Sequence, residues 1–563
     1  MADDGPEGFH FASLFEQVAR RVPEREAVVQ HDARLTFAEL NDAADAVAQC
    51  LVDCSVAAGD RVGVGSTNRW EMLAALIGIC KAAAIPFALN PRYTPPEIRH
   101  IIDDCDPALV IADARTAQRL ADAGFAAVWD IDVHPIVWDT DSQPIASDTD
   151  VQPISHARQT DAVATHEART RRDSDLFLIY TGGTTGTPRG VAWTHRDLFF
   201  GALGGGRPGG PAIETPAELS GAVVSRSVRL AVASPLVHGT AQWGALGALL
   251  TGATVVIDNA ESFDARRLLR LLATEHVAYL TIVGDAFAQP LCDELAAHPG
   301  DYDLDALTVV LSGGAPLTPS YAARLSELLP GAVIVDGFGA SETGGFGNAV
   351  CSATRVETTF VLDESSAVLG DDGAPVAIGE SGRLARRGPI PQGYWNDPHN
   401  TGKRFWDIAG QRWALSGDRA VRVDATTVRL LGRDDRCITT GGEKVDADEV
   451  ERALCSLDGV DAALVVGIPH ARFGHAVAAV LVATSGPTNT DAGNSGPGSS
   501  GPGSSKSGLR PARSAGQLAA ELASSLAEYK VPRHVVYVDA LRYTPEGKPD
   551  YTWARDLLMA DAT

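Results

Sequence analysis

A loop rich in glycine and threonine lies between Tyr180 and Gly190, where the chain reads Tyr-Thr-Gly-Gly-Thr-Thr-Gly-Thr-Pro-Arg-Gly. Glycine lets backbone N–H groups converge on an anion, and threonine hydroxyls add further donors. An apolar run precedes the loop and a helical pattern follows it at 195–200, so we expect the loop to join a strand to a helix. The stretch predicts a phosphate-binding loop, and its donors would be Thr181, Gly182, Gly183, Thr184, Thr185, Gly186 and Arg189.

Two known glycine-rich motifs do not fit this loop. Its spacing is neither that of the P-loop nucleotide-binding proteins nor that of the dinucleotide folds. The remaining alternative to a phosphate site is a surface loop that is merely rich in glycine and threonine.

The loop resembles the Thr-Ser/Gly-Gly-Ser/Thr-Thr-Gly-x-Pro-Lys-Gly signature of the adenylate-forming superfamily, which includes acyl-CoA synthetases, luciferases and peptide-synthetase adenylation domains. Arg189 replaces the usual lysine. Both side chains are cations, but a guanidinium is a planar fork rather than a point charge. Five further stretches match the superfamily in order, so the resemblance extends from Phe9 to Tyr551.

Three of these stretches would hold the nucleotide. The string Asp-Gly-Phe-Gly-Ala-Ser-Glu at 336–342 resembles the motif in which an aromatic ring stacks on adenine, a hydroxyl reaches the α-phosphate and a carboxylate holds Mg²⁺. A helix-capping role for the glutamate is the alternative. Leu-Ser-Gly-Asp at 415–418 resembles the motif whose carboxylate binds the ribose hydroxyls, and 432–438 resembles the motif after it. The resemblance thus implies nucleotide contacts from Gly313, Asp336, Gly337, Phe338, Ser341, Glu342, Asp418 and Arg433.

The last stretches imply the two steps of catalysis. Thr-Pro-Glu-Gly-Lys at 544–548 resembles the motif of the catalytic lysine. A carboxylate that attacks ATP is an anion approaching an anion, and Lys548 could stabilise the charge in the transition state. The alternative is an exposed lysine in a glycine turn. Asp435 would be the hinge, and Gly441 with Gly442 would form the loop common in CoA ligases, although Thr439 stands where many relatives have lysine.

The acyl pocket would be lined from the middle of the chain. Pro-Leu-Val-His-Gly at 235–239 resembles the motif whose histidine borders this pocket. The pocket residues would be His238, Val283, Gly284, Gly314 and Gly339. Their glycines leave room for a long or bulky apolar acid, but small residues also serve tight backbone packing.

The resemblance implies an ATP-dependent acyl-CoA synthetase that forms acyl-AMP with Mg²⁺ and then transfers the acyl group to CoA. Several strings, among them Gly-Lys-Pro-Asp-Tyr at 547–551, look closest to fatty-acyl and steroid side-chain CoA ligases of bacteria. One rival is an acyl-AMP ligase that delivers to a carrier protein or an amine. Another is a catalytically silent protein that binds an acyl group or a nucleotide. The oligomeric state, including a homodimer, stays open.

The pattern of helices and strands predicts an α/β fold. Strands are expected at 61–65, 176–179, 230–235, 253–257, 278–283, 308–311 and 332–335, and helices at 36–51, 70–84, 95–104, 265–275, 319–329 and 514–529. Such alternation favours two doubly wound sheets, to which the resemblance adds a small distorted β-barrel and a small, mobile α+β C-terminal domain. We expect domains at 1–432 and 433–563. The Ser-, Gly- and Pro-rich stretch at 485–508 is expected to be a disordered surface insertion.

The composition of the chain limits which binding partners and which cellular compartment we expect. The net charge of −25 makes nucleic acid and anionic membranes poor partners. No apolar run reaches about 18 residues, the length of a spanning helix, and the eight cysteines include no Cys-x-x-Cys pair. We therefore expect a reduced, cytoplasmic protein without a transmembrane segment.

Overall fold

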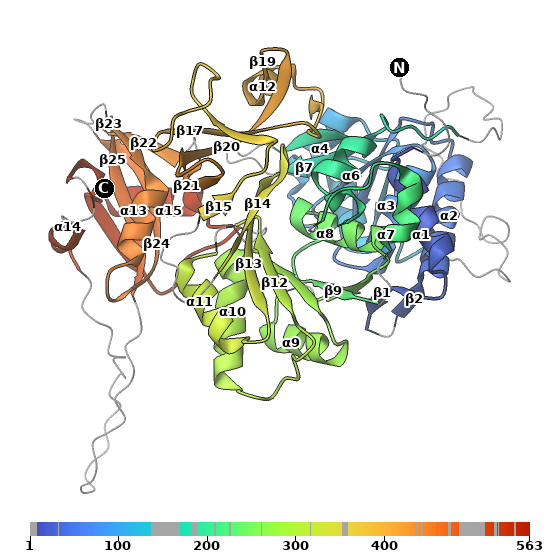
Figure 1. Cartoon of the computed structure of the whole chain (residues 1–563), viewed down its shortest axis with the longest axis horizontal. Coiled ribbons are helices and arrows are strands. Elements are labelled where there is room, and N and C mark those ends of the chain that lie inside the picture. The colour runs from blue at the N-terminus through green and yellow to red at the C-terminus, as the bar shows by residue number, and fades with distance from the viewer. Residues whose placement is uncertain are drawn as a thin grey trace, which may run out of the picture. The chain divides into compact units, whose positions relative to one another are not determined.

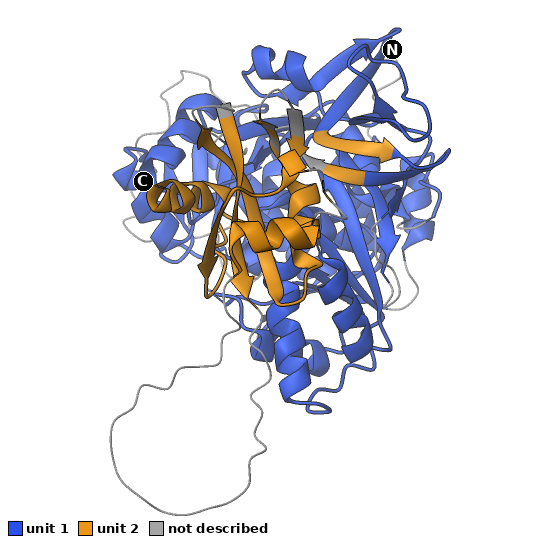
Figure 2. Ribbon diagram, turned by 90° about the vertical axis from the view of Figure 1, so that its left-hand side faces the viewer, with its two compact units in different colours: residues 1–416, 422–429 blue, residues 417–421, 430–563 orange. Residues whose placement is uncertain are grey.

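The computed structural model describes residues 8–31, 33–136, 169–181, 188–207, 210–223, 227–260, 262–315, 317–351, 359–433, 436–440, 443–470, 474–483, 513–522, 526, 528–544 and 548–562. The chain divides into two compact units (Figure 2), residues 1–416 with 422–429 and residues 417–421 with 430–563. The expected insertion at 485–508 lies outside the described residues.

A seven-stranded sheet in the first unit carries the glycine-rich loop. Its strand order is β18-β8-β7-β4-β3-β5-β6. The strands are β3 (Arg61–Gly65), β4 (Ile85–Ala88), β5 (Leu109–Ala112), β6 (Val128–Asp130), β7 (Leu176–Thr181), β8 (Arg189–Thr194) and β18 (Gly393–Tyr394). β3, β4 and β5 pair in parallel, and the helices that alternate with them are α3 (Trp70–Lys81), α4 (Pro95–Cys105) and α5 (Ala114–Asp122). This part of the α/β prediction is confirmed.

The connection after the glycine-rich loop differs from the prediction. The loop does not lead directly into a helix, because β8 lies between the loop and α6 (His195–Gly201). β8 pairs antiparallel with β7, and its central residues Val191, Ala192 and Trp193 are buried. That buried run forms a strand, so the loop closes a β-hairpin and is followed by strand backbone rather than by the N-terminus of a helix.

An eight-stranded sheet forms the other α/β layer of this unit (Figure 1), in the order β14-β13-β12-β11-β9-β10-β1-β2. Its strands are β1 (Glu26–Gln30), β2 (Ala33–Thr36), β9 (Arg229–Val232), β10 (Thr254–Ile257), β11 (Tyr279–Ile282), β12 (Val309–Gly313), β13 (Val333–Ala340) and β14 (Gly344–Val350). The accompanying helices include α8 (Gly239–Leu250), α9 (Ala265–Thr274), α10 (Gly284–Ala297) and α11 (Pro319–Leu328). β1 pairs in parallel with β10, so the N-terminal segment completes a sheet built mainly from residues beyond 229.

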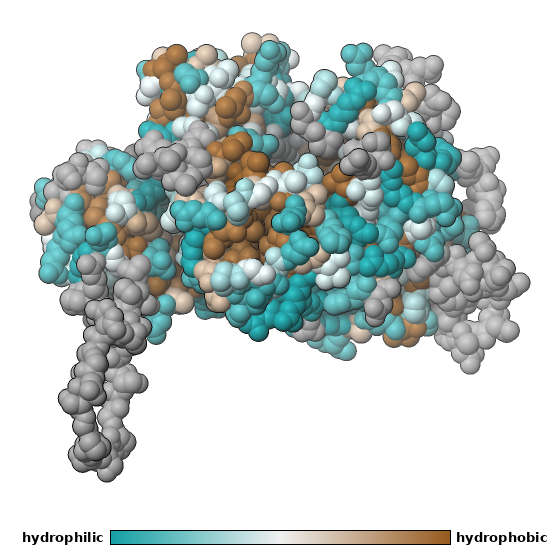
Figure 3. Space-filling view, turned by 60° about the horizontal axis from the view of Figure 1, so that its bottom comes forward, coloured by the Kyte–Doolittle hydropathy of each residue, from teal (hydrophilic) through white to brown (hydrophobic). Residues whose placement is uncertain are grey.

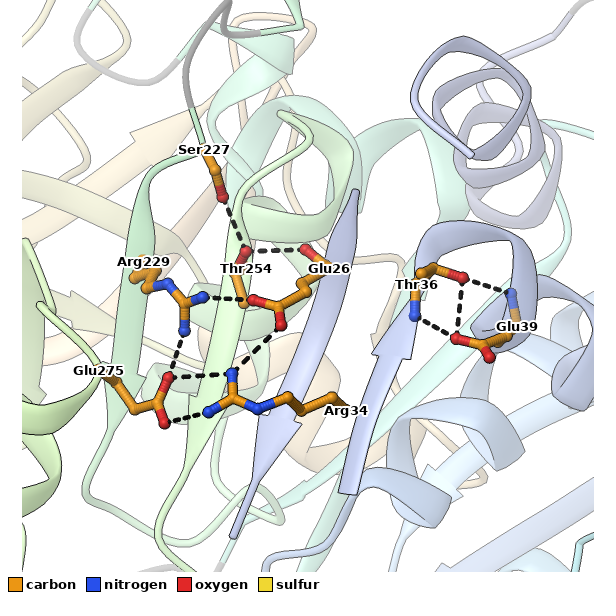
Figure 4. A network of polar contacts seen from close by, with 8 residues as sticks. All are labelled: Glu26, Arg34, Thr36, Glu39, Ser227, Arg229, Thr254 and Glu275. Atoms are coloured by element: carbon orange, nitrogen blue, oxygen red, sulfur yellow. Dashed lines mark hydrogen bonds and ion pairs between the residues drawn. The ribbon is translucent and has the colours of Figure 1, made fainter. Parts of the chain in front are cut away.

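A network of charged side chains, in which Glu275 is buried and the others are partly or largely exposed, joins the N-terminal strands to the rest of this sheet (Figure 4). Arg229 donates to both Glu26 and Glu275, and Arg34 also bonds to Glu275, at 2.6 Å. The Glu275 side chain is only 8% exposed, so its charge needs both guanidinium groups. The hydroxyl of Thr254 donates to the backbone carbonyl of Glu26 at 2.7 Å. The network fixes β1 and β2 against β9 and β10.

The same figure shows how the helix after β2 begins. Thr36 caps α2 (Phe37–Asp53), with its hydroxyl accepting from the Glu39 N–H and the Glu39 carboxylate accepting from the Thr36 N–H. Such a capping box satisfies two backbone donors that a helix start leaves open.

A six-stranded sheet follows, in the order β15-β21-β20-β17-β16 with β19 beside β20. Its strands are β15 (Thr359–Val361), β16 (Ser366–Leu369), β17 (Ser381–Arg387), β19 (Phe405–Ile408), β20 (Gln411–Arg422) and β21 (Thr427–Arg433), and α12 (Pro398–Arg404) precedes β19. β15 with β21, β16 with β17 and β19 with β20 pair antiparallel. This antiparallel sheet stands where the small distorted barrel was expected.

The second unit is a small α+β structure, as predicted. Its sheet has the order β23-β22-β25-β24 with β26 beside β25. The elements are β22 (Cys437–Thr440), β23 (Glu443–Asp446), α13 (Ala447–Cys455), β24 (Val460–His470), β25 (Gly474–Ala483), α14 (Ala515–Leu522), β26 (His534–Val538) and α15 (Tyr551–Asp561). The helix expected at 514–529 is thus shorter, and a 3₁₀ turn follows it at Glu528–Lys530.

On the face drawn in Figure 3, apolar residues gather in patches among hydrophilic ones. The large apolar side chains that are exposed include Tyr279, Val333, Val350 and Val361. Over the described ranges, no helix combines the length and hydropathy needed to cross a membrane.

Two stacked histidines lie in the core beside β7. The rings of His10 and His195 are 3.9 Å apart, and the His195 Nδ1 accepts from the Phe11 N–H at 3.2 Å. Burial lowers the pKa of His195 to about 3. Burial and the neighbouring His195 also depress the pKa of His10 far below its ordinary value. Both rings are therefore neutral in the folded protein.

The histidine pair should make the protein less stable in acid. Histidine pKa values are about 6.5 in the unfolded chain, so below that pH the unfolded state binds more protons and the free energy of unfolding falls as pH falls. Each ring should cost about 2 kcal/mol between pH 7 and pH 5. Replacing His10 with phenylalanine should remove one such contribution, measured as unfolding free energy at the two pH values. His399→Gln, at an exposed position, should keep the full pH dependence, and equal slopes for all three proteins would contradict the assignment.

Candidate active site

The hairpin of β7 and β8 brings Thr181 and Arg189 opposite each other. Residues 182–187 between them lie outside the described part, so the predictions for Gly182, Gly183, Thr184, Thr185 and Gly186 remain predictions. The guanidinium of Arg189 lies 5.9 Å from the ring centroid of Tyr394, and its Nε is 3.4 Å from the carboxylate of Asp397. Tyr394 and Asp397 thus hold Arg189 at the end of the hairpin where the glycine-rich loop joins the two strands.

The acidic motif lies where β13 turns into β14. Asp336, Phe338 and Gly339 belong to β13, while Ser341 and Glu342 form the turn. The Tyr394 hydroxyl donates to Glu342 Oε1 at 2.7 Å, and both residues are half-buried. Because β18 pairs with β8, Tyr394 lies opposite Val191. The structure therefore brings Glu342 and Arg189 to the same tyrosine.

Two other side chains fix the backbone of this turn. The indole N–H of Trp193 donates to the carbonyl of Ser341 at 3.0 Å. The guanidinium of Arg386 on β17 donates to the carbonyl of Thr343 in the turn, at 3.5 Å, and to that of Gly345 just after it, and its side chain is almost fully buried. The turn that presents Ser341 and Glu342 is consequently tied to two different sheets.

Asp336 and Phe338 lie within the strand rather than after it. Burial, together with the nearby Asp285, raises the pKa of Asp336 to about 7. The Phe338 ring stacks against Phe346 with 5.4 Å between centroids. The Phe360 ring lies 5.6 Å from it as well, so the aromatic residue expected to face adenine already has two aromatic neighbours.

His238 occupies the N-cap position of α8, and its side chain makes no capping hydrogen bond. The turn before it is held by Asn68, which donates to the carbonyl of Ser234 at 3.0 Å and accepts from the N–H of Leu236 at 2.7 Å. Asn68 follows β3 of the seven-stranded sheet, so this side chain couples the two α/β layers next to His238.

The structure brings several expected pocket residues together near the start of α8. A side chain on Gly314 would lie 3.1 Å from the hydroxyl of Thr240 and 3.9 Å from Val283, and Gly314 has a φ of +86°. Gly313 also faces Thr240. Gly284 begins α10 and donates its N–H to Ser312. These residues cluster at the carboxyl ends of β11 and β12.

Gly339 is different, because backbone packing accounts for it. A side-chain carbon there would come within 2.6 Å of the carbonyl oxygen of Gly344. The contact belongs to the β13–β14 pair, in which Gly339 faces Gly345. Gly337 is similarly close to Ser312 and Asn348. For these two positions, tight packing explains the glycine without reference to a ligand.

The remaining expected residues belong to the second unit. Asp418 lies on β20 and is half-buried, and Arg433 ends β21. Lys548 is exposed, and its backbone carbonyl accepts from the Thr544 N–H at 2.7 Å. The Lys548 side chain is thus open to solvent, while its backbone is joined to that of Thr544. Asp435, Gly441 and Gly442 lie outside the described residues, although register pairs the flanking Thr440 with Glu443.

The residue after the expected hinge is firmly anchored within the small unit. Arg436 contacts Asp448 at 2.7 Å and Glu451 at 2.6 Å, and its guanidinium lies 3.7 Å from the ring centroid of Tyr551. These contacts join Arg436 to α13 and to the first residue of α15.

The donor set fits a magnesium ion that arrives with the nucleotide. Among the described residues, no cluster of three or more His, Cys, Asp or Glu side chains could cage a metal. Mg²⁺ in nucleotide sites commonly takes one or two protein carboxylates and completes its octahedron with phosphate oxygens and water. Glu342, held by Tyr394, supplies such a carboxylate.

Sequence reasoning missed the side chains that hold the site. Tyr394, Trp193, Arg386 and Asn68 contact expected site residues but were not singled out. The only signal for Tyr394 was an aromatic pair after glycine in a turn-rich stretch, Gly-Tyr-Trp at 393–395. Its role depends on the β8–β18 pairing, which joins residues about 200 apart and has no local signature.

Comparisons with known proteins find one enzyme family along most of the chain. The AMP-binding enzyme family matches residues 15–395, and the C-terminal domain of AMP-binding enzymes matches residues 449–548. A medium/long-chain-fatty-acid–CoA/3-oxocholest-4-en-26-oate–CoA ligase of Mycobacterium marinum is 34% identical, covering 97% of this chain and 96% of the relative. The 3-oxocholest-4-en-26-oate–CoA ligase of Rhodococcus rhodochrous is also 34% identical, covering 97% and 95%.

Among solved structures, the amide bond synthetase McbA from Marinactinospora thermotolerans superposes with a TM-score of 0.74 at 21% identity. The match covers 97% of this chain and 99% of that one. At this identity, the similarity shows that the fold is shared.

Proposed function

The chain belongs to the AMP-binding enzyme family of AMP-forming acid–CoA ligases, and we propose that it activates a medium- or long-chain fatty acid or a steroid side-chain acid. The observation that supports adenylation is the convergence of Arg189 and Glu342 on Tyr394, because a cation and a carboxylate are the groups that would bind a nucleotide's phosphates and its metal. The acid class is supported by the relatives, which are named as ligases of such acids.

In the first half-reaction, the substrate carboxylate attacks the α-phosphorus of ATP, and pyrophosphate leaves with the electron pair of the broken P–O bond. We assign phosphate binding to Thr181, Arg189 and Ser341. When bound, Mg²⁺ would neutralise phosphate charge beside Glu342. Lys548 would lie between the two approaching anions. The base and ribose contacts fall to Gly313, Asp336, Gly337, Phe338, Asp418 and Arg433.

In the second half-reaction, the CoA thiol attacks the acyl carbonyl and AMP leaves. We assign the domain 433–563 to both steps, presenting Lys548 first and the loop of Gly441 and Gly442 second, with rotation about Asp435 between them. The contacts of Arg436 with Asp448 and Glu451 support the proposal, because they would keep the residue next to the pivot with α13 during such a rotation.

The acyl group would lie beside His238, Val283, Gly284 and Gly314. Thr240, on the first turn of α8, and Val283 both lie close to Gly314, so an acyl chain here would meet a small, largely apolar lining. An amide, formed by transfer of the acyl group to an amine instead of CoA, is the alternative product to be tested, because the fold is shared with an amide bond synthetase.

The proposal predicts a steep dependence on acyl size. Each buried methylene contributes roughly 0.8 kcal/mol, or about a fourfold rise in kcat/KM. Pyrophosphate release should be measured across a series from acetate to C12 and a steroid side-chain acid, with CoA or an amine as acceptor. We expect little turnover of acetate, rising activity with chain length, and AMP release that depends on CoA. Equal use of acetate and C8 would refute the large pocket, and AMP release that requires an amine would favour the alternative acceptor.

A further inference from the structure

We infer that Tyr394 is a positioning residue that holds the Glu342 carboxylate for the metal–nucleotide complex. The inference rests on the proposed function and assigns a role to a side chain outside the nucleotide-binding motifs. A carboxylate that binds a metal is commonly oriented by a hydrogen bond to its other oxygen, and removing such an outer partner typically lowers metal affinity about 10- to 100-fold.

The geometry identifies the tyrosine hydroxyl as that partner. It donates to Glu342 Oε1 at 2.7 Å, a distance typical of a strong bond to a charged acceptor. In this bond the phenolic hydroxyl is the donor and the Glu342 carboxylate is the acceptor.

The tyrosine itself is fixed from several sides. Its N–H donates to the Thr401 hydroxyl at 2.9 Å, and its ring meets Phe405 edge to face with 6.1 Å between centroids. β18 pairs with β8 at the same residue. These contacts involve the backbone and the ring, so removal of the hydroxyl alone should leave Tyr394 in place.

Arg189 gives this arrangement a second consequence. Its guanidinium lies over the same ring, 5.9 Å from the centroid, and contacts Asp397 on the far side of β18. Tyr394 thus lies between the glycine-loop cation and the metal carboxylate. The Tyr394 side chain therefore sets the distance between Arg189, which would bind the negative phosphates, and Glu342, which would bind the positive metal ion.

The test is Tyr394→Phe, which keeps the ring and deletes the hydroxyl. Binding of Mn²⁺, in place of Mg²⁺, is measured by electron paramagnetic resonance in the presence of α,β-methylene-ATP, an unreactive analogue. We expect the dissociation constant for Mn²⁺ to rise about 10- to 100-fold, while binding of AMP without metal stays unchanged. In the Glu342→Gln background the tyrosine substitution should have no further effect, because the two groups act as one unit.

The chain offers a matched control. Tyr302 donates to Glu294 on α10, a similar pair in another part of the first unit, and Tyr302→Phe should leave Mn²⁺ binding unchanged. If the wild-type protein releases pyrophosphate but Tyr394→Phe binds Mn²⁺ normally, the positioning role is overturned and the proposed function stands. If the wild-type protein releases no pyrophosphate with any acid, both are overturned.

Discussion

Replacing Lys548 with alanine is expected to slow acyl-AMP formation by about 100- to 1,000-fold, the cost of losing one preorganised charge at a transition state. Transfer of the acyl group from preformed acyl-AMP to CoA should be nearly unchanged, because no triphosphate takes part in that step. The Lys548 side chain is exposed, and its link to Thr544 is made by its backbone carbonyl, so the substitution should not affect folding. Pyrophosphate release and thioester formation measure the two steps separately.

Lys403 provides the control for this experiment. It is also exposed, lies at the end of α12 and belongs to none of the expected motifs. Lys403→Ala removes the same charge and should leave both half-reactions at the wild-type rate. An equal loss of both half-reactions in Lys548→Ala would contradict a role confined to adenylation.

Glu342→Gln should have the second largest effect. The amide keeps the shape of the side chain but removes the negative charge, so the Mg²⁺ concentration for half-maximal adenylation should rise about 10- to 100-fold. Added Mg²⁺ should recover part of the activity, which a purely structural defect would not allow. Glu364→Gln, at an exposed position of the same unit, should titrate with Mg²⁺ as the wild-type protein does. A Glu342→Gln variant with unchanged Mg²⁺ dependence would remove Glu342 from the metal site.

Local patterns in the sequence predicted individual helices and strands better than they predicted which elements pack or pair together. The strand at 61–65 and the helices at 95–104 and 319–329 were found within a residue or so, because apolar spacing and proline caps are local signals. The helix α10 was missed, and it contains Pro290, which argues against a helix on sequence grounds. β8 was missed because its buried run follows a loop rich in glycine and was short enough to be read as part of it.

The candidate site shows the same limit. Expected residues such as Glu342 and Arg189 were found through their motifs, but the side chains that bring them together come from distant segments. Trp193 reaches Ser341 across 148 residues of sequence, and Tyr394 reaches Glu342 across 52. Such contacts depend on strand pairing, and strand pairing between distant segments leaves no pattern in either segment.

The charge network that holds β1 and β2 in the eight-stranded sheet also limits how early this sheet can be completed during synthesis. Thr254 and its partner Glu26 are 228 residues apart, and Glu275 is later still. At 5 to 20 residues per second, a ribosome needs roughly 10 to 50 s to make that length. During this interval Val28 and Val29, whose side chains lie on opposite faces of β1, can pair with β2 but not yet with β10. The N-terminal segment can therefore complete its sheet only after β10 has been made, and until then Glu26 and Arg34 lack their partners Arg229 and Glu275.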